Sequence, residues 1–187
     1  AWNTAGIIPP VRRGQPGHSA DRSPYVASLA SVVDRFAISA DRKKILDGLL
    51  KYRAALQGLG LTSGFQWLDG SFLEDVETQE SRPPKDVDVV TYFHLPAGET
   101  QVSLNVKAGA LFDNDQVKLN YHVDAYTSVL GGPLNVFVIR RVAYWYSMWS
   151  HRRDGMWKGF VQIDLSPTED TPALAILASK LSGVSAS

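Results

Sequence analysis

The sequence predicts an α+β fold, or a mixed α/β fold, with a small mixed β-sheet flanked by helices. Strand-like runs and helix-like stripes follow one another in irregular order, which favours a mixed sheet. Of the 187 residues, 44% are hydrophobic, enough for one buried core. The apolar or alternating patterns predict strands over residues 64–68, 86–93, 118–129 and 160–165.

Helix-like patterns cover six segments: 25–37, 40–57, a short one opening at Gly70-Ser71, 99–112, 134–150 and 167–181. We expect Ser39 to cap the second of them. Its predicted buried stripe is Ile45, Leu46, Leu49, Leu50 and Leu56. In 134–150 the spacing predicts an exposed Tyr144 and a buried stripe of Val138, Val142, Trp145 and Trp149.

The composition indicates one domain preceded by an arm. Residues 1–24 are rich in Pro, Gly and Arg, typical of an extended, partly disordered N-terminal arm, and residues 25–187 form the expected single domain. The absence of cysteine excludes disulfides, thiolate zinc sites and a cysteine nucleophile, and a cytoplasmic location is the natural expectation. Nineteen basic residues balance nineteen acidic ones, so no overall field attracts nucleic acid or a membrane. No apolar run is long enough to span a membrane, and the N-terminus lacks the pattern of a signal peptide.

Three aspartates on strand-like runs form the main candidate site. Residues two apart in a strand point to the same face, so Asp86 and Asp88 project side by side while Val87 and Val89 face the core. Two close carboxylates repel each other unless a cation compensates, and Mg²⁺ prefers such oxygen ligands. Asp124, in an apolar-flanked strand position, supplies a third carboxylate. Two metal ions held by three carboxylates can bind nucleotide phosphates and act on an in-line displacement.

The Gly70-Ser71 pair is the candidate phosphate-binding turn. A glycine after a strand lets the backbone approach a phosphate closely. A helix that starts at Ser71 would aim free N–H groups at an anion, and the serine hydroxyl adds a donor.

These motifs resemble those of the polymerase-β-like nucleotidyltransferase superfamily. The resemblance rests on "WLDGS", a spacer of fourteen residues, "DVDVV" and a later "HVDAY", and it covers about residues 65–126. The whole sequence is also similar to an uncharacterised bacterial family placed in that superfamily. The resemblance implies a nucleotidyltransferase-like fold, triphosphate contacts from Gly70 and Ser71, and metal ligation by Asp86 and Asp88. It further implies that Asp124 binds the catalytic metal and activates the acceptor hydroxyl.

The expected function is transfer of a nucleoside monophosphate from an NTP such as ATP to a hydroxyl group, with two Mg²⁺ ions or Mn²⁺ in their place. The acceptor stays open between a partner protein, a nucleic acid and a small molecule. One alternative is a catalytically weak nucleotide-binding protein or the partner of a toxin or defence protein. Another is a metal-dependent phosphodiesterase that adds His122, which the predicted alternation puts on the face of Asp124.

Simpler interpretations stand beside these expectations. The three site aspartates could be solvated strand residues, and Gly70-Ser71 an ordinary turn and helix cap. Asp69 is explained by a turn. Nucleotide phosphates could be bound by Arg140, Arg141, Arg152, Arg153 and Lys158, but a solvated surface explains most of these residues. Two rival third carboxylates, Asp113 and Asp115, have the pattern of a helix cap or turn.

Overall fold

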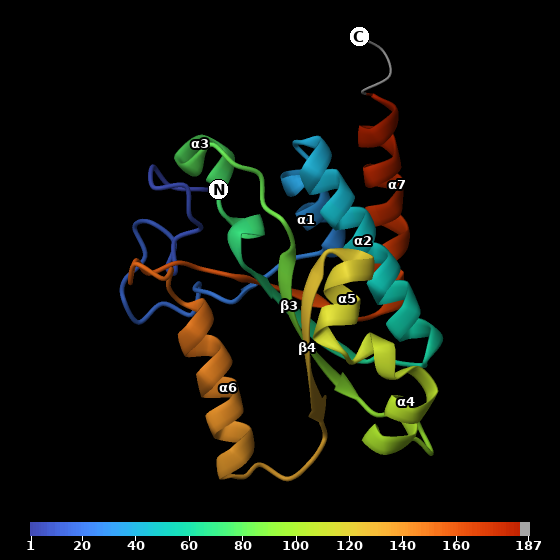
Figure 1. Cartoon of the computed structure of the whole chain (residues 1–187). Helices are drawn as coiled ribbons and strands as arrows, with labels where there is room; N and C mark the ends of the chain where they lie inside the picture. Colours follow the sequence, from blue (N-terminus) through green and yellow to red (C-terminus); the bar gives the residue numbers. More distant parts are fainter. Residues whose placement is uncertain (184–187) are drawn as a thin grey trace.

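A five-stranded mixed sheet is the centre of the molecule (Figure 1), as seen in a computed structural model that describes residues 1–183. The strands are β1 (Tyr25–Val26), β2 (Gly64–Asp69), β3 (Val87–His94), β4 (Val123–Leu130) and β5 (Val161–Asp164), in the order β1-β5-β2-β3-β4. β2 runs antiparallel to both β3 and β5, whereas β3–β4 and β1–β5 are parallel pairs. The predicted α+β class with a mixed sheet is therefore confirmed.

Seven α-helices and three short 3₁₀ helices surround the sheet in the described residues. They are α1 (Leu29–Phe36), α2 (Ala40–Gly58), η1 (Ser71–Leu73), α3 (Val76–Glu80), α4 (Gln101–Ala108), η2 (Gly109–Leu111), α5 (Asn114–Tyr121), α6 (Val136–Trp149), η3 (Pro167–Glu169) and α7 (Asp170–Ser182). The Ser39 side chain caps α2 by accepting from the backbone N–H of Arg42, as predicted. The predicted stripe of α2 is buried in the core. None of the helices in residues 1–183 is long and apolar enough to cross a membrane.

Helices cover both faces of the sheet. Figure 1 shows α1, α2 and α7 together on one side and α6 on the other. Alternation along β3 sends Val87 and Val89 into the core, where both are fully buried. On the opposite face, Tyr126 of β4 meets Trp145 of α6 with ring centroids 4.6 Å apart. The face that carries Tyr126 also carries Asp124, so α6 covers the face of the candidate site.

The segment predicted as one strand over 118–129 divides into a helix and a strand. Asp113 caps α5 by accepting from the N–H of Gln116, and the helix continues to Tyr121. His122 ends it in the left-handed region with φ 57°, and β4 begins at the next residue. Apolar residues at 117 and 121 fit a helical period as well as an alternating one, which is why the pattern misled. Leu119, which lies in this helix, is 74% exposed.

Two other expected apolar stripes are only partly buried. In α6, Trp145 and Trp149 are buried as predicted, but Val138 and Val142 are about two-fifths exposed. The helix packs on the sheet through its C-terminal half, and its N-terminal end projects beyond the strands (Figure 1). Tyr144 is exposed, as predicted. The first predicted helix starts later than expected, because residues 25–26 form the edge strand β1.

The N-terminal segment, residues 1–24, lies against the body although it has no helix. The Trp2 indole Nε1 donates to the Leu73 carbonyl oxygen at 2.6 Å, and the Asp75 N–H donates to the Gly6 carbonyl oxygen at 2.7 Å. Ile7 is buried. These contacts attach the arm to the chain that follows Gly70-Ser71.

Candidate functional site

Three aspartates lie in register across neighbouring strands. Asp69 of β2 is opposite Asp88 of β3, and Asp88 is opposite Asp124 of β4. Residues directly opposite each other in a sheet project from the same face. Asp86 lies just before β3 and joins the group through Lys118, whose ammonium contacts both Asp86 and Asp124. The structure thus brings the predicted Asp86, Asp88 and Asp124 together and adds Asp69 to the row.

Lys118 bridges two of the predicted carboxylates. Its Nζ lies 2.9 Å from Asp86 Oδ2 and 2.7 Å from Asp124 Oδ2. The lysine comes from the last turn of α5, and Asn114 at the start of that helix donates to Asp124 Oδ1 at 2.7 Å. Burial opposes ionisation of Asp124, but hydrogen bonds from Lys118 and Asn114 outweigh it and lower the pKa of that carboxyl. The hydrogen bond to Asp124 in turn raises the pKa of Lys118.

Asp88 stands at the centre of the row with excess negative charge around it. Burial, followed by the neighbouring charges of Asp124 and Asp86, raises the pKa of Asp88 from its ordinary 3.8 to about 6. The ammonium groups of Lys118 and Lys158 only partly offset this. An additional cation beside Asp88 would therefore favour its ionised form.

The Gly70 backbone lies directly against Asp88. Gly70 has φ 83°, and a Cβ at this position would lie 1.7 Å from Asp88 Oδ2. Only glycine combines this conformation with such a close approach. Ser71 follows at the start of η1, and the helix expected there consists of this single turn followed by a separate α3. The predicted phosphate turn and the central carboxylate are thus adjacent.

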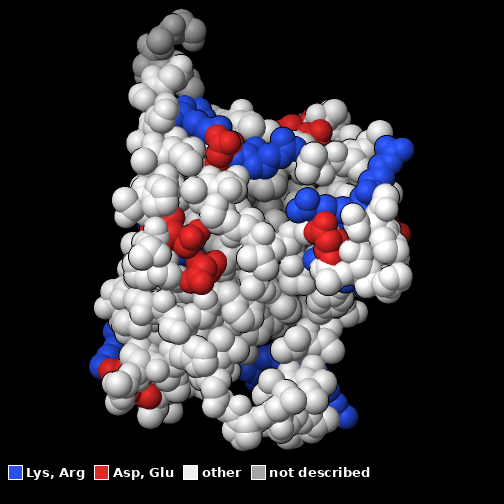
Figure 2. All heavy atoms as spheres, turned by 180° about the vertical axis from the view of Figure 1, so that it is seen from behind, with Lys and Arg blue, Asp and Glu red and all other residues white. Residues whose placement is uncertain are grey.

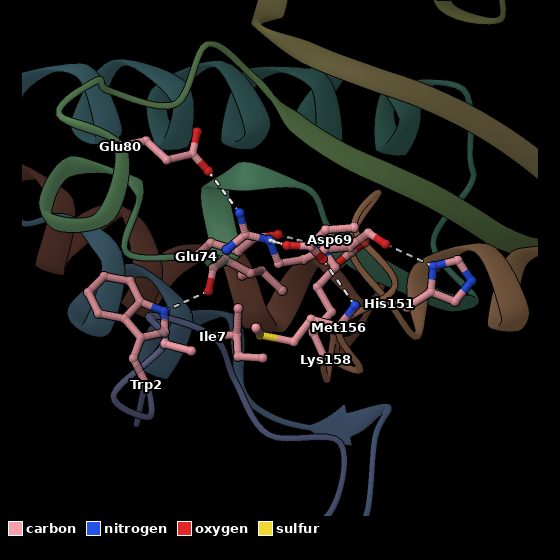
Figure 3. A network of polar contacts seen from close by, with 12 residues as sticks. Trp2, Ile7, Asp69, Glu74, Glu80, His151, Met156 and Lys158 are labelled. Carbon is pink, nitrogen blue, oxygen red and sulfur yellow. Dashed lines mark hydrogen bonds and ion pairs between the residues drawn. The ribbon is translucent and has the colours of Figure 1, made fainter.

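A buried lysine, which sequence reasoning did not single out, joins the two ends of this turn. Lys158 Nζ lies 3.1 Å from Asp69 Oδ1, just before Gly70, and 2.8 Å from Glu74 Oε1, just after η1 (Figure 3). The Asp69 contact is an ion pair without hydrogen-bond alignment, since Oδ1 has no hydrogen-bond partner among residues 1–183. Burial raises the pKa of Asp69 to about 7, and Lys158 opposes that rise. The two carboxylates raise the pKa of Lys158 against the effect of burial.

A second buried cation fixes the turn from the other side. Arg42 Nη1 donates to the Phe72 carbonyl oxygen at 2.5 Å, and Nη2 donates to the Glu74 carbonyl oxygen at 2.6 Å. The Arg42 side chain also pairs with Glu77 at 2.6 Å. Charge-assisted bonds of this kind hold a turn in one geometry. The segment from Gly70 to Glu74 is therefore preorganised by Lys158, by Arg42 and by Trp2 of the arm.

One sequence signal could have found Asp69, and none marks Lys158. Asp69 lies two residues after Trp67 in an apolar strand, so alternation alone puts the two side chains on the same face of the sheet. Its partner Asp88 follows only from the pairing register, which the local sequence does not determine. Lys158 follows a turn before β5, where a lysine is usually solvated; here it is 5% exposed.

The donor types suit a hard divalent cation, although Lys118 lies where such an ion would bind. Among residues 1–183, no three acidic or histidine side chains converge closely enough to hold a metal as they stand. The Lys118 side chain is 44% exposed, and a metal ion would have to displace its ammonium group. Asp86, Asp88 and Asp124 would then present clustered carboxylate oxygens, the ligands that Mg²⁺ prefers. In this arrangement the Lys118 ammonium supplies the positive charge that the carboxylates need.

The other candidates are placed differently. Asp113 is the cap of α5 and Asp115 is an exposed residue of its first turn, as their pattern predicted. His122 lies outside β4, so the alternation that put it beside Asp124 does not apply. Two cavities, of about 220 and 590 Å³, lie elsewhere, and no carboxylate of the row lines either one.

Comparison with known proteins identifies a family and no characterised relative. No curated protein matches the chain, and no solved structure matches it. A protein-family model described as a family of unknown function, DUF6932, matches residues 1–164, which include every strand and the whole carboxylate row. The chain therefore belongs to the DUF6932 family.

Proposed function

We propose that this protein transfers a nucleoside monophosphate from an NTP to a hydroxyl acceptor. In the reaction, the oxygen of the acceptor hydroxyl bonds to the α-phosphorus as the bond to the pyrophosphate oxygen breaks. Pyrophosphate leaves, and the hydroxyl proton passes to solvent. A divalent cation, when bound, would neutralise the phosphate oxygens and the carboxylates that hold it. The residues that would hold it are Asp86, Asp88 and Asp124. This extends the resemblance to the polymerase-β-like nucleotidyltransferases.

The observation that carries the proposal is the contact between Gly70 and Asp88. These residues are 18 positions apart in the chain, yet no side-chain atom would fit between the Gly70 backbone and the Asp88 carboxylate. An ordinary turn does not require its backbone to lie against a half-buried carboxylate. A triphosphate with a bound cation requires both features: a backbone that the phosphate can approach closely, and carboxylate oxygens that bind the cation.

The protein residues have separate tasks in this proposal. The Gly70-Ser71 turn binds phosphate oxygens, and Lys158 and Arg42 keep the turn in place. Asp124 orients the acceptor hydroxyl. While Lys118 contacts Asp124, the pKa of the Asp124 carboxyl is lowered and Asp124 is a weak base. Most of the catalytic effect therefore comes from positioning and charge neutralisation.

The test is metal-dependent NTP turnover by Asp88→Asn. The substitution keeps shape and removes the central charge, so turnover of labelled NTPs should fall by at least about a hundredfold. The matched control is Asp115→Asn, which removes an exposed carboxylate outside the row and should leave turnover unchanged. Equal turnover in wild type and Asp88→Asn would refute the proposal. A screen of labelled NTPs against cell lysate then identifies whether the acceptor is a protein, a nucleic acid or a small molecule.

A second candidate function is nucleotide binding with little catalysis, as in a sensor or the partner of a toxin or defence protein. The observation that favours it is Lys118, which neutralises Asp86 and Asp124 without a metal. Calorimetry with an NTP and Mg²⁺ followed by a turnover assay separates the two functions. Binding without turnover, in wild type and Lys118→Met alike, favours the binding protein. Turnover that appears or rises in Lys118→Met favours the transferase.

A further inference from the structure

A groove separate from the carboxylate row lies between the N-terminal arm, α1 and the edge strand β1. Its volume is about 590 Å³, within the range of pockets for small ligands. Three arginines and three aromatic rings are among the residues that line it: Arg12, Arg13, Arg35, Trp2, Tyr25 and Phe36. The arm therefore forms one wall of a basic and aromatic groove.

The arginines of this groove are largely free to bind a ligand. Arg12 pairs with Asp21 at 3.0 Å, but its side chain stays 67% exposed. Within residues 1–183, no carboxylate lies within ion-pair distance of Arg13 or Arg35. The whole chain is electrically neutral, and the face in Figure 2 shows charged side chains in small groups among uncharged ones. The groove has three guanidinium groups and one paired carboxylate, Asp21, and therefore carries a local excess of positive charge.

The aromatic rings present flat surfaces beside these charges. The Arg35 guanidinium carbon lies 4.8 Å from the centre of the Trp2 ring, and that of Arg12 lies 5.8 Å from the centre of Tyr25. Guanidinium planes and aromatic rings are the surfaces on which nucleobases stack, and free guanidinium groups bind phosphate. Both kinds of surface occur here within a volume that suits one nucleotide.

We propose that this groove binds a nucleotide, either free or as one unit of a single strand. The flat base stacks on Tyr25, since Arg35 and Arg42 already lie against the Trp2 ring, and Arg13 and Arg35 bind the phosphate. An added peptide strand fits less well, because β1 has only two residues and offers little edge for strand pairing. The proposal is independent of the transfer reaction, since it uses none of the carboxylates.

The test measures binding in EDTA, with Asp88→Asn as the parent protein, so that the carboxylate row does not contribute. The probes are adenosine monophosphate by calorimetry and a short fluorescent single-stranded RNA by anisotropy. Arg13→Gln and Arg35→Gln should each weaken binding roughly tenfold, the usual loss for one charge-assisted hydrogen bond. Each should also lower the salt dependence of RNA binding by about one phosphate contact. The control Arg140→Gln removes an exposed arginine of α6, outside the groove, and should bind as the parent does.

The outcomes distinguish a free nucleotide from a single strand, and some of them would refute the proposal. Equal affinity for both probes indicates a free nucleotide, and tighter binding of RNA indicates a strand; either result supports the groove. The proposal is overturned if neither probe binds, or if the Arg13→Gln and Arg35→Gln variants keep the parent affinity. It is also overturned if Arg140→Gln loses as much affinity as they do, or if a polyglutamate peptide binds as tightly as the nucleotides. Circular dichroism of each variant checks that the fold is retained.

Discussion

Replacing Asp88 by asparagine should stabilise the protein at neutral pH while removing its proposed activity. Asp88 is half-buried beside Asp86 and Asp124, and its pKa is raised from 3.8 to about 6. A carboxylate whose pKa is higher in the folded than in the unfolded protein favours folding only when protonated. Its favourable contribution is complete below about pH 4 and is lost as the pH rises through about 6. At neutral pH the ionised Asp88 therefore lowers the free energy of unfolding.

The magnitude follows from the difference between the two pKa values. That difference corresponds to at most about 3 kcal/mol, and solvent near the partly exposed side chain reduces it to about 1–3 kcal/mol. Asparagine keeps the shape and carries no charge, so the variant should gain this amount above about pH 7. For a chain of this length, 1 kcal/mol raises Tm by about 2–4 °C, so a rise of about 5 °C is expected.

The assay is thermal unfolding of wild type and Asp88→Asn across pH 4 to about 7.5. The two proteins should unfold at similar temperatures at the acid end and diverge as the pH rises. A variant that is no more stable at neutral pH, or a difference that does not change with pH, would refute the electrostatic reasoning. Adding Mg²⁺ should raise the Tm of wild type more than that of the variant, because only wild type keeps all three carboxylates.

Three further substitutions test the turn and the two lysines. Gly70→Ala should abolish NTP binding, measured by calorimetry, because the new Cβ would overlap the Asp88 carboxylate. The control Gly14→Ala has a similar φ of 84° and open space around it, so it should bind NTP normally and lose only about 1 kcal/mol of stability. Lys158→Met removes the cation that lies against two buried carboxylates, of which only Glu74 keeps another, Arg152 at 3.6 Å, and it should cost about 3–5 kcal/mol in urea unfolding. The exposed Lys44→Met should change the stability by less than about 0.5 kcal/mol. Lys118→Met should bind Mn²⁺ several-fold more tightly, by paramagnetic resonance of the free ion, because its ammonium no longer competes; equal or weaker binding would contradict that role.

Local patterns were sufficient for most of the elements and for the central pair of the site. The apolar stripe and the Ser39 cap predicted α2, because a helix is specified by neighbours along the chain. Period-two alternation in β3 predicted that Val87 and Val89 are buried and that Asp86 and Asp88 share the other face. Both inferences need only the geometry of one element.

Features that depend on pairing between elements were not accessible in the same way. Asp69 belongs to the row only because β2 and β3 pair in a register that puts it opposite Asp88. A shift of one residue would send it to the other face of the sheet. The burial of Lys158 likewise depends on how the chain before β5 lies under the Gly70 turn. Neither the strand register nor the burial of Lys158 can be predicted from the neighbouring residues in the sequence.

The error over residues 118–121 has a direct consequence for the chemistry of the site. As part of a strand, Lys118 would have lain far from Asp124, six residues away at the strand spacing. In the structure, α5 turns back onto the start of β4, so its last turn brings the Lys118 ammonium between Asp86 and Asp124. The helix that sequence reasoning missed therefore supplies the cation that competes for the third carboxylate, Asp124. Under the proposed function, transfer as opposed to binding alone depends on how readily Lys118 leaves, which makes Lys118→Met the most informative single substitution.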